Sequence, residues 1–183
     1  HVMVDLCRSI GATITSKGAY SLRIDPTTIH TYKATGPLVA RIRASYYLLG
    51  ALLGRFGKAS LRMPGGCNFG QRPIDYHLKA FKLMGAKGTN SRDMDNGIIN
   101  LVADNLKGAK VFFDIASVGA TINVMLAACK AQGTTIINNA AKEPHIVDVA
   151  NFLNSMGANI KGAGTDVIRV KGVTSLHGTE YTV

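Results

Sequence analysis

The stretch from residue 64 to residue 77, PGGCNFGQRPIDYH, holds residue types that could do chemistry. Glycines on both sides of Cys67 allow positive φ angles and a close approach of the backbone to a ligand. Arg72 follows, and Pro73 suits the first turn of a helix, so the loop should end at a positive helix N-terminus. An arginine and such a helix end both favour a thiolate and attract an anion. We therefore expect Cys67 to be reactive, as a proton donor or as an adduct-forming group, rather than an inert buried thiol.

The other two cysteines, Cys7 and Cys129, lie in apolar helical patterns, and we expect them to be inert. Three cysteines are an odd number without metal-ligand spacing, so we expect reduced thiols in a cytoplasmic protein, with no metal and no cofactor. No apolar run reaches the roughly 18 residues that a membrane span needs, and the first residues lack the pattern of a secretory signal.

Three further features could contact a ligand. Asp75 and His77 lie in the first turn of the helix that Pro73 begins. Their side chains there could cap the helix and face solvent, or they could equally well contact a ligand. Residues 117–119, Ser-Val-Gly, would begin another helix with a serine N-cap and a glycine that lets a ligand approach. Arg43 lies among apolar neighbours, so it needs an anionic partner or a route to solvent.

The net charge of +10 is unevenly distributed. Residues 1–92 hold 14 Lys and Arg against 3 acidic residues, whereas residues 93–183 hold 7 against 8. The basic half contains the Cys67 loop and should attract anions, whether nucleic acid, phosphates or carboxylates. No basic run interleaved with aromatic residues favours nucleic acid among these.

Strands and helices alternate along the chain and must position these residues. Strands are expected at residues 12–15, 20–25, 28–32, 59–63, 97–103, 110–113, 134–138, 167–170 and 181–183. Helices are expected at residues 2–10, 37–56, 74–84, 118–131 and 145–156. The fourth of these helices is apolar on nearly all sides and should be buried.

The pattern of elements repeats. Met84-Gly85-Ala86 and Met156-Gly157-Ala158 each close a helix and open a strand, 72 residues apart, and Ile10-Gly11-Ala12 does the same 74 residues before Gly85. We therefore expect an α/β (α+β) fold of repeated βαβαββ units in one domain, residues 1–183, whose first unit lacks its beginning. The copy that holds Cys67 has four extra residues between its strand and its second helix, which is typical of a functional loop.

Residues 64–67, Gly70, Arg72-Pro73, Asp75 and His77 together resemble the signature loop of the UDP-N-acetylglucosamine 1-carboxyvinyltransferases, a family of enolpyruvyl transferases. The resemblance covers essentially the whole chain, including residues 43–45, 117–121, 133–135 and 139–148. It implies a fold of two inside-out α/β barrels, each with pseudo-threefold packing of βαβαββ units around buried helices. This chain would then be most of the cysteine-loop domain. The second domain and a Lys-Asn pair near the family's N-terminus would be absent from it, and the chain alone would be inactive.

The resemblance also implies a reaction and its site. The enolpyruvyl group of phosphoenolpyruvate moves to the 3-hydroxyl of UDP-N-acetylglucosamine and phosphate leaves, which is the first committed step of peptidoglycan synthesis. Cys67 matches the proton donor, which can also form an adduct with phosphoenolpyruvate and is the target of the epoxide fosfomycin. Substrate contacts are implied for Arg43, Arg72, Pro73, Ile74, Asp75, Tyr76, Ser117 and Val118. The implied partners are both substrates and the second domain, with neither nucleic acid nor a membrane.

Two alternatives stay open. A shikimate-pathway enolpyruvyl transferase would share the fold but lacks this cysteine loop. In a different class, a basic repeat domain could bind RNA, because the RNA 3′-phosphate cyclases use related units. Ligand choice separates the first reading from RNA binding, since a UDP-sugar should shift the amide NMR signals of this domain and RNA should not.

Overall fold

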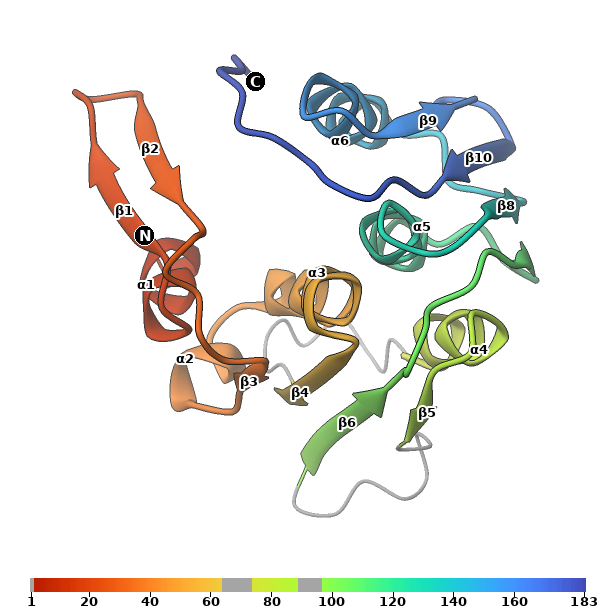
Figure 1. The fold of residues 1–183 in the computed structure, drawn as a ribbon, viewed down its shortest axis with the longest axis horizontal. Coiled ribbons are helices and arrows are strands. Elements are labelled where there is room, and N and C mark those ends of the chain that lie inside the picture. Colours follow the sequence, from red (N-terminus) through yellow and green to blue (C-terminus); the bar gives the residue numbers. More distant parts are fainter. Residues whose placement is uncertain (1, 64–73, 89–96) are drawn as a thin grey trace.

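The computed structural model describes residues 2–63, 74–88 and 97–183. Two units in it have the same order of elements (Figure 1). The first comprises β3 (Lys33–Ala34), α2 (Pro37–Ala40), the 3₁₀ helix η1 (Arg43–Tyr46), α3 (Tyr47–Phe56), β4 (Lys58–Arg62), α4 (Asp75–Leu83), β5 (Lys87–Gly88) and β6 (Ile98–Val102). The second comprises β7 (Lys110–Phe112), α5 (Val118–Ala128), β8 (Thr134–Asn138), α6 (Pro144–Ser155), β9 (Asn159–Lys161) and β10 (Val167–Lys171).

The two sheets share one topology. Their strand orders are β3-β4-β6-β5 and β7-β8-β10-β9. In each sheet the first two strands are parallel, and the last two strands of the unit join antiparallel. This confirms the βαβαββ repeat that was expected from the sequence.

The chain begins with α1 (Val2–Ser9), β1 (Thr13–Ser16) and β2 (Leu22–Asp25). Strands β1 and β2 pair antiparallel, as the last two strands of each complete unit do. These three elements therefore correspond to the second helix and the final two strands of a unit.

Helices α3 and α5 lie side by side at the centre of the molecule, with the sheets outside them (Figure 1). A Cβ added at Gly50 of α3 would lie 2.2 Å from the backbone oxygen of Asn123 in α5, so only glycine permits this contact. Eight residues of α5 are buried, as expected for a helix that is apolar nearly all round.

Helix ends fall where the repeated Met-Gly-Ala motifs predicted them. Gly85 follows α4 with φ +91°, and Gly157 follows α6 with φ +94°. These are left-handed conformations, which glycine adopts at the end of a helix without steric cost.

The expectation of one helix over residues 37–56 is wrong. Ile42 has an extended backbone (φ −143°, ψ 126°) and separates α2 from η1. The buried Ser45 hydroxyl donates to the Val39 carbonyl at 3.0 Å, across this break. A serine that bonds the local backbone in this way competes with the helical hydrogen-bond pattern, so Arg43 lies in a 3₁₀ turn rather than in a long α-helix.

Two of the expected strands are also absent from the described residues. Residues 28–32 form no strand, because Thr28 donates its hydroxyl proton to the Gly11 carbonyl at 2.6 Å and pairing with β4 begins only at Lys33. Residues 181–183 form none either. The Tyr181 hydroxyl donates to Asp148 Oδ1 at 2.6 Å, and the ring packs 5.2 Å from that of Phe152, so this segment is held by side-chain contacts to α6.

Candidate functional site

The predicted site residues fall into two groups. Cys67, Arg72 and Pro73 lie outside the described residues. The others come from three elements of the fold. Arg43 begins η1, Ile74 is buried just before α4, Asp75 and Tyr76 begin α4, Ser117 is the N-cap of α5 and Val118 is its first residue.

The structure brings these three elements together through aromatic contacts. The Arg43 guanidinium carbon lies 5.0 Å from the ring centroid of Tyr46. The Tyr46 ring lies 5.7 Å from that of His77 in α4. His77 in turn contacts α5, because its Nε2 is 3.4 Å from the position that a Cβ on Gly119 would take. Arg43 is thus connected to the start of α5 through two packed rings.

The Asn123 side chain connects η1, α3 and α4 through hydrogen-bond contacts. Its Oδ1 accepts a 2.8 Å hydrogen bond from the Gly50 backbone N–H, a group that can only donate. The other amide atom is therefore Nδ2, which donates to the Tyr46 carbonyl at 2.9 Å and lies 2.8 Å from His77 Nδ1. His77 Nδ1 must then be an acceptor, so the neutral ring carries its proton on Nε2.

Burial reinforces the neutral state of His77. Desolvation, and after it the Arg43 charge, lower the pKa of this imidazole to about 4. Burial also raises the pKa of the Tyr46 phenol, with the charge and hydrogen bond of Arg43 acting in the opposite direction. At neutral pH both rings are uncharged, and Arg43 supplies the positive charge of this cluster.

The start of α5 is suited to an anion. The Ser117 hydroxyl accepts a 3.4 Å hydrogen bond from the Ala120 N–H. The first N–H groups of an α-helix have no partner within the helix, and the helix dipole adds partial positive charge there. With the Arg43 guanidinium joined to this end of α5 through Tyr46 and His77, the arrangement can hold a phosphate or carboxylate.

Sequence reasoning did not find Asn123 or Tyr46, and it left His77 between capping and ligand contact. One signal for Asn123 was available, because it is an amide in the middle of an apolar helical pattern. Such a group must find hydrogen-bond partners when buried. Its partners on η1, α3 and α4 are distant in sequence, so only the fold identifies them.

The two described cysteines have the environments of inert thiols. Cys129 is buried, and desolvation raises its pKa to about 11. Cys7 is half-buried, and burial raises its pKa as well. Both are therefore protonated at neutral pH and poorly nucleophilic.

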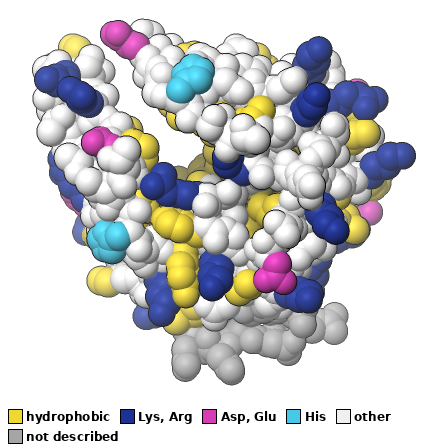
Figure 2. Space-filling view, in the orientation of Figure 1, with side chains coloured by type: hydrophobic (Ala, Val, Ile, Leu, Met, Phe, Trp, Pro, Cys, Tyr) yellow, Lys and Arg dark blue, Asp and Glu magenta, His cyan; other side chains and the backbone are white. Residues whose placement is uncertain are grey.

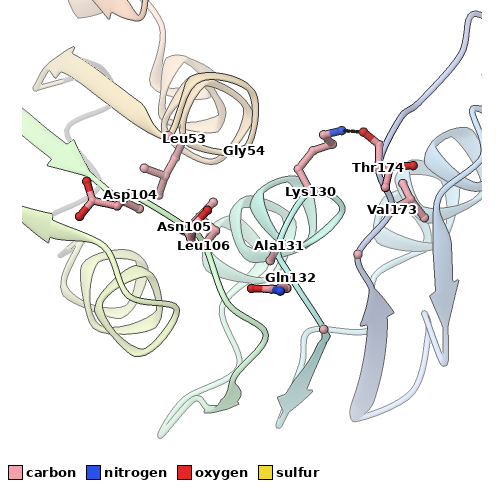
Figure 3. A pocket seen from close by; sticks show the side chains of 14 residues that line it. Leu53, Gly54, Asp104, Asn105, Leu106, Lys130, Ala131, Gln132, Val173 and Thr174 are labelled. Atoms are coloured by element: carbon pink, nitrogen blue, oxygen red, sulfur yellow. Dashed lines mark hydrogen bonds between the residues drawn. The ribbon is translucent and has the colours of Figure 1, made fainter.

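A separate pocket lies at the other end of the central helices (Figure 3). It has a volume of about 610 Å³ and is lined by residues at the ends of α3 and α5, among them Leu53, Gly57, Lys130 and Gln132. The Lys130 amine there donates to the Thr174 carbonyl. Helix C-termini present carbonyl groups rather than N–H groups, and none of the predicted site residues that the structure describes lines this pocket.

Within residues 2–63, 74–88 and 97–183, no group of three His, Cys, Asp or Glu side chains could hold a metal ion. Among the same residues, no helix has the length and apolar character needed to cross a bilayer.

Comparison with curated proteins shows close relatives. The chain is 52% identical over all its 183 residues to "UDP-N-acetylglucosamine 1-carboxyvinyltransferase 3" of Caldanaerobacter subterraneus subsp. tengcongensis. It is 53% identical over the same length to "UDP-N-acetylglucosamine 1-carboxyvinyltransferase" of Clostridium botulinum. The chain spans 43% of the length of each of these two relatives.

Solved structures show the same fold at lower identity. The enolpyruvyl transferase NikO from Streptomyces tendae matches with a TM-score of 0.77 and 24% identity, over 96% of this chain and 41% of that one. An EPSP synthase from Acinetobacter baumannii matches with a TM-score of 0.72 and 20% identity, over 97% of this chain and 40% of that one. The family model described as EPSP synthase (3-phosphoshikimate 1-carboxyvinyltransferase) matches residues 1–183. The chain therefore belongs to the EPSP synthase family of carboxyvinyltransferases.

Proposed function

We propose that this chain is part of an enzyme that transfers the enolpyruvyl group of phosphoenolpyruvate to the 3-hydroxyl of UDP-N-acetylglucosamine, with release of phosphate. The observation that carries the proposal is the identity of about half of all residues with proteins named for this reaction. The shikimate-type alternative is less well supported, because the EPSP synthase structure shares only 20% identity.

The chemistry of the described residues supports an anionic substrate at the start of α5. Both substrates of the proposed reaction carry several negative charges, and the half of the chain that includes Arg43 has the excess of positive charge. The N-terminus of α5 would hold a phosphate of the sugar nucleotide through backbone N–H groups and the Ser117 hydroxyl. Arg43, Ile74, Asp75, Tyr76 and Val118 would line the same ligand.

The loop residues Cys67, Arg72 and Pro73 would have three roles. Cys67 would donate a proton to the methylene carbon of phosphoenolpyruvate, and Arg72 would bind its phosphate region. Pro73 would contact the sugar nucleotide. A thiol has a pKa of about 8.5, and an arginine and a helix N-terminus lower it, so Cys67 could give up a proton near neutral pH.

We further propose that the chain is most of one domain of a two-domain protein. The incomplete unit formed by α1, β1 and β2 supports this. Strand β2 pairs with β1 and with no other strand among the described residues, whereas β6 and β10 each have neighbours on both sides. Leu22 and Ile24 of β2 are 54% and 58% exposed, and Figure 2 shows the molecule hollowed beside the arm that β1 and β2 form. Additional chain would pair with this edge and cover this face.

Two substitutions at Cys67 test the catalytic role in the full-length natural protein that contains this chain. Cys67→Ser should lose most turnover, because a serine hydroxyl is a far weaker acid than a thiol. Cys67→Asp should keep a useful part of it, with a pH optimum shifted to lower pH, because a carboxylic acid can donate a proton when a closed site raises its pKa. Cys67→Asp should also resist fosfomycin, since the sulfur nucleophile is gone.

Turnover of phosphoenolpyruvate and UDP-N-acetylglucosamine is measured against pH for the wild type and both variants. An active serine variant, or an inactive aspartate variant that still binds both substrates, would refute proton donation by Cys67. Failure of the wild type to release phosphate from this substrate pair would refute the proposed reaction itself. In that case, turnover with shikimate 3-phosphate, or binding of RNA, would identify the alternative.

A further inference from the structure

His77 lies where its free ring nitrogen can reach a ligand at the start of α5. Gly119 and Asn123 are four residues apart, so they are neighbours on one face of this helix, one turn from each other. The imidazole spans that turn. Its Nδ1 is 2.8 Å from the Asn123 amide nitrogen, and its Cε1 and Nε2 are 3.3 and 3.4 Å from the Cβ position of Gly119. Nε2 is therefore at the end of the ring that points toward the N-terminus of α5.

The Nε2–H group is also an unused donor. The His77 side chain is only 4% exposed, and within residues 2–63, 74–88 and 97–183 its one hydrogen-bond partner is the Asn123 amide, at Nδ1. Among the described residues, Thr135 Oγ1 is the one fully buried polar side-chain atom without a partner, so Nε2 keeps some contact with solvent and can donate to water or to a ligand. The absence of a side chain at Gly119 leaves space beside this atom, next to the helix end that favours an anion.

We propose that His77 is a binding residue whose Nε2–H donates a hydrogen bond to a phosphate oxygen of the ligand at the N-terminus of α5. This inference rests on the proposed function and adds a group to its site. Asn123 has the supporting role, since its amide N–H occupies Nδ1 and so keeps the proton on Nε2. The contact is a neutral donor to an anion, and it would persist over the physiological pH range, as the lowered pKa of His77 also indicates.

Two substitutions separate the donor from the structural role of the ring. His77→Asn places an amide near the position of Nδ1, where its oxygen can accept from Asn123, but it leaves nothing at the position of Nε2. His77→Gln is longer and can present an amide N–H near the position of Nε2. His145→Asn, at an exposed position of α6, is the matched control for the loss of a histidine.

The affinity for UDP-N-acetylglucosamine is measured by calorimetry in the full-length natural protein that contains this chain. We expect His77→Asn to bind at least about tenfold more weakly, the factor for one hydrogen bond to a charged group, and His77→Gln and His145→Asn to bind within about threefold of the wild type. Equal affinities for His77→Asn and His77→Gln, whether unchanged or reduced, would overturn the proposal.

A second measurement needs no variant, so it decides the question even if His77→Asn does not fold. In ¹⁵N NMR spectra of the wild type between pH 5 and 8, His77 should show the neutral tautomer protonated on Nε2, and added pyrophosphate should shift the Nε2 signal. A cationic ring, the other tautomer, or an Nε2 signal indifferent to both pyrophosphate and UDP-N-acetylglucosamine would overturn the inference. If pyrophosphate shifts Nε2 while the sugar nucleotide does not bind, the His77 contact stands and the proposed function fails.

Discussion

Helices α3 and α5 approach so closely at Gly50 that one added methyl group should destabilise the fold. In Gly50→Ala the new Cβ would lie 2.2 Å from the Asn123 backbone oxygen and 2.7 Å from its Oδ1. A backbone oxygen cannot rotate away, so the two helices must separate. That separation also lengthens the 2.8 Å hydrogen bond from the Gly50 N–H to Asn123 Oδ1.

The expected change in the free energy of unfolding for Gly50→Ala is the sum of three contributions. Overpacking of a core typically costs about 1–3 kcal/mol, and weakening one buried hydrogen bond adds about 1 kcal/mol. Alanine gains back about 1 kcal/mol over glycine in helix propensity. We expect a net loss of about 2 kcal/mol in the free energy of unfolding. With a urea m-value of about 2 kcal/mol/M, the midpoint would fall by about 1 M.

Gly54→Ala, one turn further along α3, is the matched control. Its Cβ would lie 3.3 Å from the Leu126 oxygen, a contact that a shift of a few tenths of an ångström relieves. The gain in helix propensity should offset this, leaving the free energy of unfolding within about 0.5 kcal/mol of the wild type. Urea unfolding followed by far-UV circular dichroism compares the three proteins. A Gly50→Ala protein as stable as the wild type, or a larger loss for Gly54→Ala, would refute the close helix contact.

Three other outcomes are expected. Thr135→Val should raise the free energy of unfolding by about 1 kcal/mol, because the buried Thr135 hydroxyl has no hydrogen-bond partner among the described residues; a urea midpoint at or below the wild-type value would contradict this. At pH 8 an electrophile should label Cys67 well before Cys129, whose raised pKa of about 11 leaves almost no thiolate, and before the half-buried Cys7. Peptide mass mapping after brief alkylation decides this, and equal labelling of all three cysteines would count against it. The 183-residue chain alone should release no phosphate from phosphoenolpyruvate and UDP-N-acetylglucosamine, because catalysis needs all oriented groups together; a standard phosphate assay that detects robust turnover would end that expectation.

The sequence indicated most of the elements and their repetition. Glycines that follow helices gave the helix ends, because a left-handed residue is needed there and glycine adopts it without cost. The βαβαββ order followed from apolar periodicity, which depends only on neighbouring residues. Local hydrogen bonds limited this reasoning. Ser45 breaks a helix by bonding the Val39 carbonyl, and Thr28 bonds Gly11 where a strand was expected.

The sequence also pointed to the Cys67 loop, since glycines, a thiol, an arginine and a proline helix start lie within one short stretch. Only the tertiary structure decided which residues surround His77 in α4, the helix that follows this loop. The contacts of Asn123 with Gly50, Tyr46 and His77 join residues 46 to 77 positions apart. No local pattern encodes such contacts, because they depend on how α3, α4 and α5 pack. The position of the His77 proton on Nε2 is therefore a property of the folded chain. The Gly50 N–H can only donate, so it fixes the orientation of the Asn123 amide, and that amide then donates to His77 Nδ1.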